Sequence, residues 1–132
     1  MKIGIVNASS RLDPARAEAV QAWFATHIPD GSVSVVFHPA SFGKHGHFGG
    51  DDASRASAFV EFANDPRLDA VWFARGGYGA CRIAEAVLPR LTGVARKKRY
   101  LGYSDAGSLL AGLYKAGFPH VAHGPMASDS VR

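Results

Sequence analysis

One serine in the chain has the neighbours that a catalytic nucleophile needs. Ser104 lies in the pentapeptide Gly102-Tyr103-Ser104-Asp105-Ala106, between an apolar run and a helical pattern. A serine elbow on an α/β sheet requires small residues two positions before and after the nucleophile, and Gly102 and Ala106 meet that requirement. The Asp105 amide would then open the helix and face a developing oxyanion. A helix N-cap is the competing interpretation of Ser104.

A second candidate loop, Arg75-Gly76-Gly77-Tyr78-Gly79, follows the apolar run 70–74. Glycines directly after a central strand allow backbone N–H groups to face a ligand, so the Gly77 amide is a candidate second oxyanion donor. A phosphate-binding loop and a plain tight turn are the alternatives. The spacing matches neither the dinucleotide-binding nor the Walker pattern, which argues against a nucleotide. Gly76 and Tyr78 are candidates for contacting a substrate.

Three other kinds of residue carry weaker signals. Ser10, within Ser9-Ser10-Arg11, is a candidate for contacting a substrate anion, with a capping role as the alternative. His45 and His47 lie two apart in a glycine-rich loop without the further ligands of a zinc site, so we expect no metal. Cys81 follows the glycine loop at a helix start, where a thiol can become reactive. We expect it instead to be a small buried residue of that helix.

The predicted strands and helices that position these loops alternate along the chain. Apolar runs predict strands at 3–6, 33–37, 70–74, 100–103 and 120–123, and helical periodicity predicts helices at 14–27, 52–63, 80–88 and 106–115. This order favours a parallel sheet with right-handed crossovers and helices on both faces. We predict a flavodoxin-like or Rossmann-like α/β fold with strand order 2-1-3-4-5. Ligands bind such sheets at the carboxyl ends of the strands, where both candidate loops fall.

The composition is that of one globular domain, because 47% of the 132 residues are hydrophobic and only 20% are charged. The net charge of +4 is concentrated in the run Arg96-Lys97-Lys98-Arg99. No aromatic residues are interleaved with that run, so we expect no nucleic-acid binding. No stretch approaches the ~20 apolar residues of a membrane span, and the first residues do not form a signal peptide. We therefore expect a cytoplasmic protein without a membrane partner.

The two loops together resemble the N-terminal domain of the LD-carboxypeptidase family. These serine peptidases include murein tetrapeptide carboxypeptidases and microcin C immunity peptidases. The resemblance is carried by the paired motifs at 75–79 and 102–105 and continues through the stretches 49–55, 64–66 and 123–126. It covers essentially the whole chain. Either motif alone would be a weak signal, whereas the pair is fairly specific.

The resemblance implies that residues 1–132 form the nucleophile-bearing domain of a two-domain enzyme. Ser104 matches the nucleophile of a Ser-Glu-His triad, and the amides of Asp105 and Gly77 match the oxyanion hole. The glutamate and histidine would lie in a C-terminal domain that this chain does not contain. A serine hydroxyl is a poor nucleophile without an adjacent base, so we expect the isolated chain to be inactive.

The implied reaction is hydrolysis of the amide bond to a terminal D-alanine in murein tetrapeptides during cell-wall recycling, without a cofactor. The expected partners are the murein peptide, the C-terminal domain and a second copy in a homodimer. Two alternatives stay open. One is a microcin immunity-type peptidase that acts on a peptidyl-nucleotide. The other is a non-catalytic flavodoxin-like module that binds a phosphate or nucleotide with Gly76–Gly79.

Overall fold

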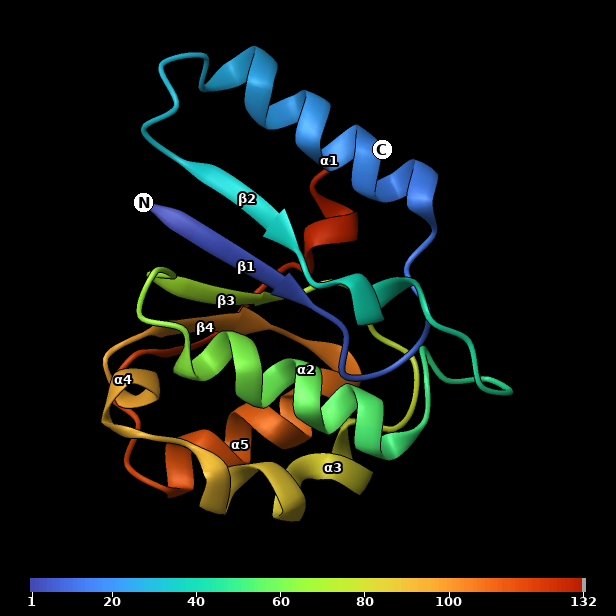
Figure 1. Ribbon diagram of the computed structural model, residues 1–132, viewed down its shortest axis with the longest axis vertical. Helices are drawn as coiled ribbons and strands as arrows, with labels where there is room; N and C mark the ends of the chain where they lie inside the picture. Colours follow the sequence, from blue (N-terminus) through green and yellow to red (C-terminus); the bar gives the residue numbers. More distant parts are fainter. Residues whose placement is uncertain (132) are drawn as a thin grey trace.

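The computed structural model describes residues 1–131 as a five-stranded parallel sheet with helices on both faces (Figure 1). The strands are β1 (Lys2–Val6), β2 (Ser34–Phe37), β3 (Ala70–Phe73), β4 (Arg99–Gly102) and β5 (Val121–His123). Their order is β2-β1-β3-β4-β5, and every neighbouring pair is parallel. The predicted fold class and strand order are confirmed. The order reverses between β1 and β3, where a doubly wound sheet forms its ligand crevice.

The helices are distributed unequally between the two faces. They are α1 (Pro14–His27), α2 (Asp52–Asn64), α3 (Ala80–Val87), α4 (Gly93–Arg96) and α5 (Gly107–Lys115), with short 3-10 turns η1 (Pro39–Phe42), η2 (Leu88–Arg90), η3 (Ser104–Ala106) and η4 (Ala127–Asp129). α1 lies on one face, and α2, α3 and α5 cover the other (Figure 1). Asp13 caps α1 by accepting from the Ala15 amide, and Asp51 caps α2 by accepting from the Ser54 amide.

Each face of the sheet has its own apolar layer. Beneath α2 and α3, the rings of Phe59 and Phe73 stack 5.7 Å apart, and the fully buried Tyr100 packs beside Phe59. Burial raises the pKa of the Tyr100 phenol. On the α1 side, Ile5 and Val20 are buried in a separate cluster. The side chains of adjacent strand residues alternate between these layers, which fixes the register of the sheet.

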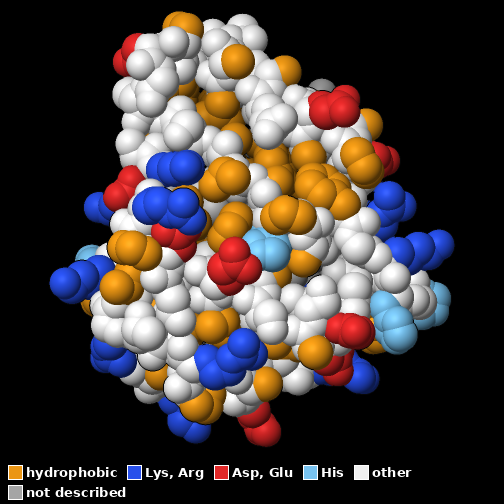
Figure 2. Space-filling model, viewed as in Figure 1, with side chains coloured by type: hydrophobic (Ala, Val, Ile, Leu, Met, Phe, Trp, Pro, Cys, Tyr) orange, Lys and Arg blue, Asp and Glu red, His pale blue; other side chains and the backbone are white. Residues whose placement is uncertain are grey.

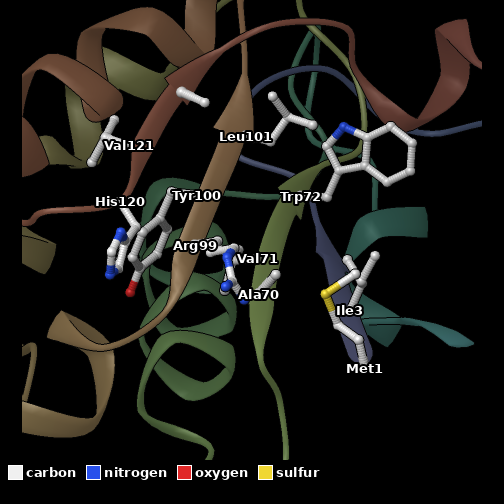
Figure 3. Close-up of a pocket in the computed structure, with 11 residues that line it drawn as sticks. Met1, Ile3, Ala70, Val71, Trp72, Arg99, Tyr100, Leu101, His120 and Val121 are labelled. Atoms are coloured by element: carbon white, nitrogen blue, oxygen red, sulfur yellow. The ribbon is translucent and has the colours of Figure 1, made fainter. Parts of the chain in front are cut away.

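The α1 face is only partly covered. Ile3, Trp72 and Leu101 border an open hollow of about 430 Å³ on the sheet surface (Figure 3). The chain segment after β5 returns to the same side of the sheet, where the Trp72 indole donates to the Pro125 carbonyl at 2.7 Å. From α1, Arg16 donates to the Val131 carbonyl at 2.7 Å. This hollow is apolar and lies away from the strand ends that carry the candidate loops.

Two residues of the basic run, Arg96 and Lys98, bind backbone carbonyls of other loops. Lys98 is buried, and its ammonium donates to the carbonyls of Asp65 and Leu68 at 2.5 and 2.6 Å. Burial lowers the pKa of Lys98. Arg96 donates to the carbonyls of Ala116 and Gly117, both at 3.0 Å. On the face drawn in Figure 2, Lys and Arg side chains are scattered, with Asp and Glu between them.

Some details of the prediction differ from the structure. The strand bounds shift by a residue or two, α4 and the 3-10 turns were not predicted, and α5 begins at Gly107 because the three residues before it form a tighter turn. The expected burial of Cys81 is wrong, because its side chain is exposed. The buried positions of α3 are Ala80, Ile83 and Val87, and their spacing places Cys81 on the solvent side of the helix.

Within residues 1–131, no helix is long and apolar enough to cross a membrane.

Candidate functional site

Ser104 sits in a strained backbone conformation directly after β4. Its φ is +54°, and it is the one non-glycine residue with a positive φ among those that the structure describes. A side chain in this region costs about 1–3 kcal/mol and persists only where the surroundings fix it, most often at functional sites. Its side chain is exposed at the carboxyl end of the sheet. This is the geometry of a sharp strand-to-helix elbow.

The residues two positions either side of Ser104 must be small, as predicted from the sequence. A Cβ placed on Gly102 would come within 2.8 Å of the Phe73 ring, so the packing of that ring leaves no space for a side chain at Gly102. Ala106 is completely buried beneath the turn. A side chain at position 102 would therefore clash, and a larger residue at position 106 would have to fit into the buried interior.

The alternative that Ser104 caps a helix is wrong. The N-cap positions of η3 and α5 are Tyr103 and Ala106, and neither element has a side-chain cap hydrogen bond. A capping serine has extended backbone angles, whereas Ser104 is left-handed. The Ser104 hydroxyl makes no hydrogen bond within residues 1–131 and points to the surface. It is therefore free to meet a ligand.

The glycine loop after β3 lies against the elbow. A Cβ on Gly76 would sit 3.2 Å from the Ser104 hydroxyl. Gly77 has φ +128°, and a Cβ there would come within 2.7 Å of the Ser10 Cβ. The Ser10 amide donates to the Gly76 carbonyl at 3.3 Å. The fold thus brings together four of the predicted site residues, Ser104, Gly76, Gly77 and Ser10. Tyr78 is 75% exposed and is not among the residues that line the hollow beside Ser104.

That hollow has a volume of about 230 Å³ and is mostly polar. Its lining comes from the glycine loop, the elbow and the segment after β5: Arg75, Gly76, Gly77, Tyr103, Ser104, Met126, Ser128 and Asp129. The Ser128 amide donates to the Ala74 carbonyl at 3.0 Å, which fixes that segment beside β3. Sequence reasoning did not identify this third wall, because only its contact with β3 brings it to the site.

The side chain of Asp105 connects the elbow to both neighbouring loops. Its Oδ2 accepts from the Ser9 hydroxyl at 2.5 Å and from the Ala80 amide at 2.9 Å. The second bond caps α3, whose own N-cap residue, Gly79, has no side chain to do so. From the sequence, only the backbone amide of Asp105 was predicted to have a role. The glycine at the start of α3 was the available signal, because a helix without a capping side chain of its own needs an acceptor from elsewhere in the chain.

Within residues 1–131, no histidine is hydrogen-bonded to the Ser104 hydroxyl. His123 packs edge-on against the Tyr103 ring, with centroids 6.1 Å apart, and borders a neighbouring hollow of about 320 Å³. His45 forms a backbone bridge with Phe48 in the loop before α2, and His38 contacts Glu61 at 3.1 Å. Within the described residues, no three His, Cys, Asp or Glu side chains gather as a metal site would require.

A doubly wound sheet with a strained serine turn after β4 and a glycine loop beside it has the backbone geometry of the nucleophile elbow in α/β enzymes. Residues 3–124 match the family described as the LD-carboxypeptidase N-terminal domain. The chain belongs to this family.

The relatives and solved structures agree with that assignment. The chain is 34% identical over 99 residues to a Streptomyces coelicolor protein named as a carboxypeptidase, covering 73% of this chain and 32% of that protein. It is 28% identical over 131 residues to a Bacillus subtilis protein named as a murein peptide carboxypeptidase. That match covers 98% of this chain and 39% of the Bacillus subtilis protein. The chain therefore spans 32% and 39% of the lengths of these two relatives.

Solved structures of the same fold include an MccF-like protein from Bacillus anthracis and a muramoyltetrapeptide carboxypeptidase from Oxalobacter formigenes. The first has a TM-score of 0.77 at 20% identity and covers 97% of this chain and 38% of that one. The second has a TM-score of 0.71 at 20% identity and covers 96% of this chain and 40% of that one. At these identities the likeness establishes the fold.

Proposed function

We propose that this chain is the nucleophile-bearing domain of an LD-carboxypeptidase, a cytoplasmic serine peptidase that releases the terminal D-alanine from murein tetrapeptides. The observation that carries the proposal is the left-handed Ser104 with its hydroxyl against the Gly76 backbone. Backbone strain of this kind occurs most often at functional sites. The name of the Bacillus subtilis relative supports the substrate class.

In this mechanism the Ser104 hydroxyl attacks the carbonyl of the amide that joins the terminal D-alanine. The oxyanion of the tetrahedral intermediate accepts hydrogen bonds from the backbone amides of Asp105 and Gly77. Collapse of the intermediate expels the amine of D-alanine and leaves an acyl group on Ser104, which water then hydrolyses. Gly76 and Ser10 border the scissile bond, and the hollow beside Arg75 receives the substrate's polar end.

The general base comes from outside the described residues. We propose that a C-terminal domain supplies the glutamate and histidine, because the chain spans only 32% and 39% of its two matched relatives. We call the resulting longer protein the two-domain enzyme. The 132-residue chain alone is then inactive, since an unassisted serine hydroxyl is almost entirely protonated near neutral pH.

The test is release of D-alanine from a murein tetrapeptide by the two-domain enzyme and its Ser104→Ala variant. Loss of the nucleophile lowers kcat by a factor on the order of 10⁴ or more, with folding unchanged. Ser57→Ala, an exposed serine of α2, is the matched control and keeps full activity. Activity in Ser104→Ala within tenfold of the parent would overturn the assignment, and activity of the isolated chain would overturn the need for a second domain.

A second candidate is a microcin immunity-type peptidase that acts on a peptidyl-nucleotide. Its support is the exposed Tyr103 on the rim of the hollow, since aromatic faces stack on nucleobases. A structure titled as MccF with aspartyl sulfamoyl adenosine has a TM-score of 0.75 at 24% identity. Relative kcat/KM on a murein tetrapeptide and on an aminoacyl-nucleotide mimic separates the two.

A further inference from the structure

A single buried guanidinium connects three loops at the carboxyl end of the sheet. Arg55 of α2 has a relative exposure of 0% and donates to the carbonyls of Gly50, Ala8 and Gly79. Its second terminal nitrogen pairs with Asp52, one turn earlier in the helix. Burial lowers the pKa of Arg55, while the charge of Asp52 opposes that effect. A buried charge persists only where it is paired and fully hydrogen-bonded, as here.

The bond to Gly79 reaches the elbow through one peptide group. The Gly79 carbonyl and the Ala80 amide belong to the same peptide plane. Arg55 Nη1 donates to that carbonyl at 2.9 Å, and Asp105 Oδ2 accepts from that amide at 2.9 Å. The peptide is therefore held from opposite ends by the guanidinium and by the residue next to Ser104.

Gly79 is fitted to this arrangement. Its φ is +116°, and a Cβ there would come within 2.7 Å of the Arg55 Nη1. Any side chain at this position would push the guanidinium away from the carbonyl it binds. The close approach of the Gly79 backbone to the Arg55 guanidinium therefore explains why the loop ends in glycine. A role in the oxyanion hole would not require a glycine at this position.

A second route leads from the same guanidinium to the same carboxylate. Arg55 also donates to the carbonyl of Ala8, in the peptide that precedes Ser9. The Ser9 hydroxyl donates to Asp105 at 2.5 Å. Both routes converge on Asp105, whose backbone is covalently continuous with the strained serine.

We propose that Arg55 is a positioning residue, which sets the serine elbow relative to the glycine loop by fixing the Gly79–Ala80 peptide and the Ala8–Ser9 peptide. The inference rests on the proposed hydrolase function and deepens it. Lysine cannot replace arginine here, because one ammonium on a flexible stem does not reach three carbonyls and a carboxylate in the fork-shaped arrangement that a guanidinium makes.

The test compares Arg55→Lys with Arg67→Lys in the two-domain enzyme. Arg67 is exposed and paired with Asp65 away from the site, so its variant keeps full activity. For Arg55→Lys we expect kcat to fall on the order of 100-fold with KM nearly unchanged, as for a displacement of roughly 1 Å at the reacting group. Hydrogen exchange of the Ala80 amide accelerates in the same variant. A third variant, Val20→Ala, loosens the distant α1 layer and controls for lost stability without a change in kcat.

The outcomes separate this inference from the proposed function. If the parent enzyme shows no turnover, the proposed function fails. If the parent turns over and a folded Arg55→Lys variant keeps its kcat within twofold, the positioning role is wrong. If Arg55→Lys does not fold, Asp52→Asn carries the test, because it removes the counter-charge at a partly exposed position. We expect Asp52→Asn to lower kcat and speed Ala80 exchange, and unchanged values for both would overturn the inference.

Discussion

Replacing Gly77 with alanine tests the glycine loop at the position where the structure leaves least room. The alanine would have to adopt φ +128°, which costs about 1–3 kcal/mol for a residue with a side chain. Its Cβ would also lie 2.7 Å from the Ser10 Cβ, and ordinary contact begins at 3.4 Å. Rotation of the serine hydroxyl cannot relieve a clash between two Cβ atoms, so the loop backbone must move by about 0.7 Å or more.

A shift of that size displaces the Gly77 amide from the oxyanion. Losing one oxyanion donor costs about 10²–10³ in kcat, so we expect a fall of that order in Gly77→Ala of the two-domain enzyme, with KM changed far less. Steady-state release of D-alanine measures both constants. Gly93→Ala is the control, since nothing lies within 4 Å of its new Cβ and its φ is ordinary. A Gly77→Ala enzyme with kcat within twofold of the parent would refute the assignment of this amide.

Three further outcomes are expected. Lys98→Met leaves the carbonyls of Asp65 and Leu68 without their donor and lowers the free energy of unfolding by about 2 kcal/mol in urea titrations; an unchanged midpoint would contradict this. Arg67 lowers the pKa of Asp65 from 3.8 to about 2, so the ionised carboxylate stabilises the fold above pH 3.8 and this contribution is lost as the pH falls toward 2. Asp65→Asn should lose less stability across that window, and equal losses would disprove the linkage. With Trp72 on an uncovered sheet face, the isolated chain should self-associate, and a monomer by light scattering would argue against it.

The sequence was most informative where local rules govern the structure. The alternation of apolar runs and helical patterns predicted the strand order, because right-handed crossovers leave few ways to connect parallel strands. The elbow was predicted for the same kind of reason. Gly102 lies under the Phe73 ring and Ala106 is fully buried, and the requirement for small residues at these two positions is visible in five consecutive residues.

The supporting contacts could not be predicted because they join distant parts of the chain. Arg55 lies 47 positions from Ala8, and the Ser9–Asp105 bond spans 96 positions. A buried arginine in an amphipathic helix gives no local sign of which carbonyls it binds. Lys98 is a similar case, since a run of four basic residues indicates a solvated surface until the fold shows that one ammonium caps the turn before β3.

The central claim is that the strained Ser104 is a nucleophile, and covalent labelling tests it most directly. The two-domain enzyme is treated with a serine-directed phosphonate, digested and analysed by mass spectrometry. We predict one phosphonylated peptide, modified at Ser104, with loss of D-alanine release in proportion to labelling. An unlabelled Ser104 in an enzyme that still turns over, or an unlabelled protein stabilised only by nucleotides, would contradict the account and favour a non-catalytic binding module.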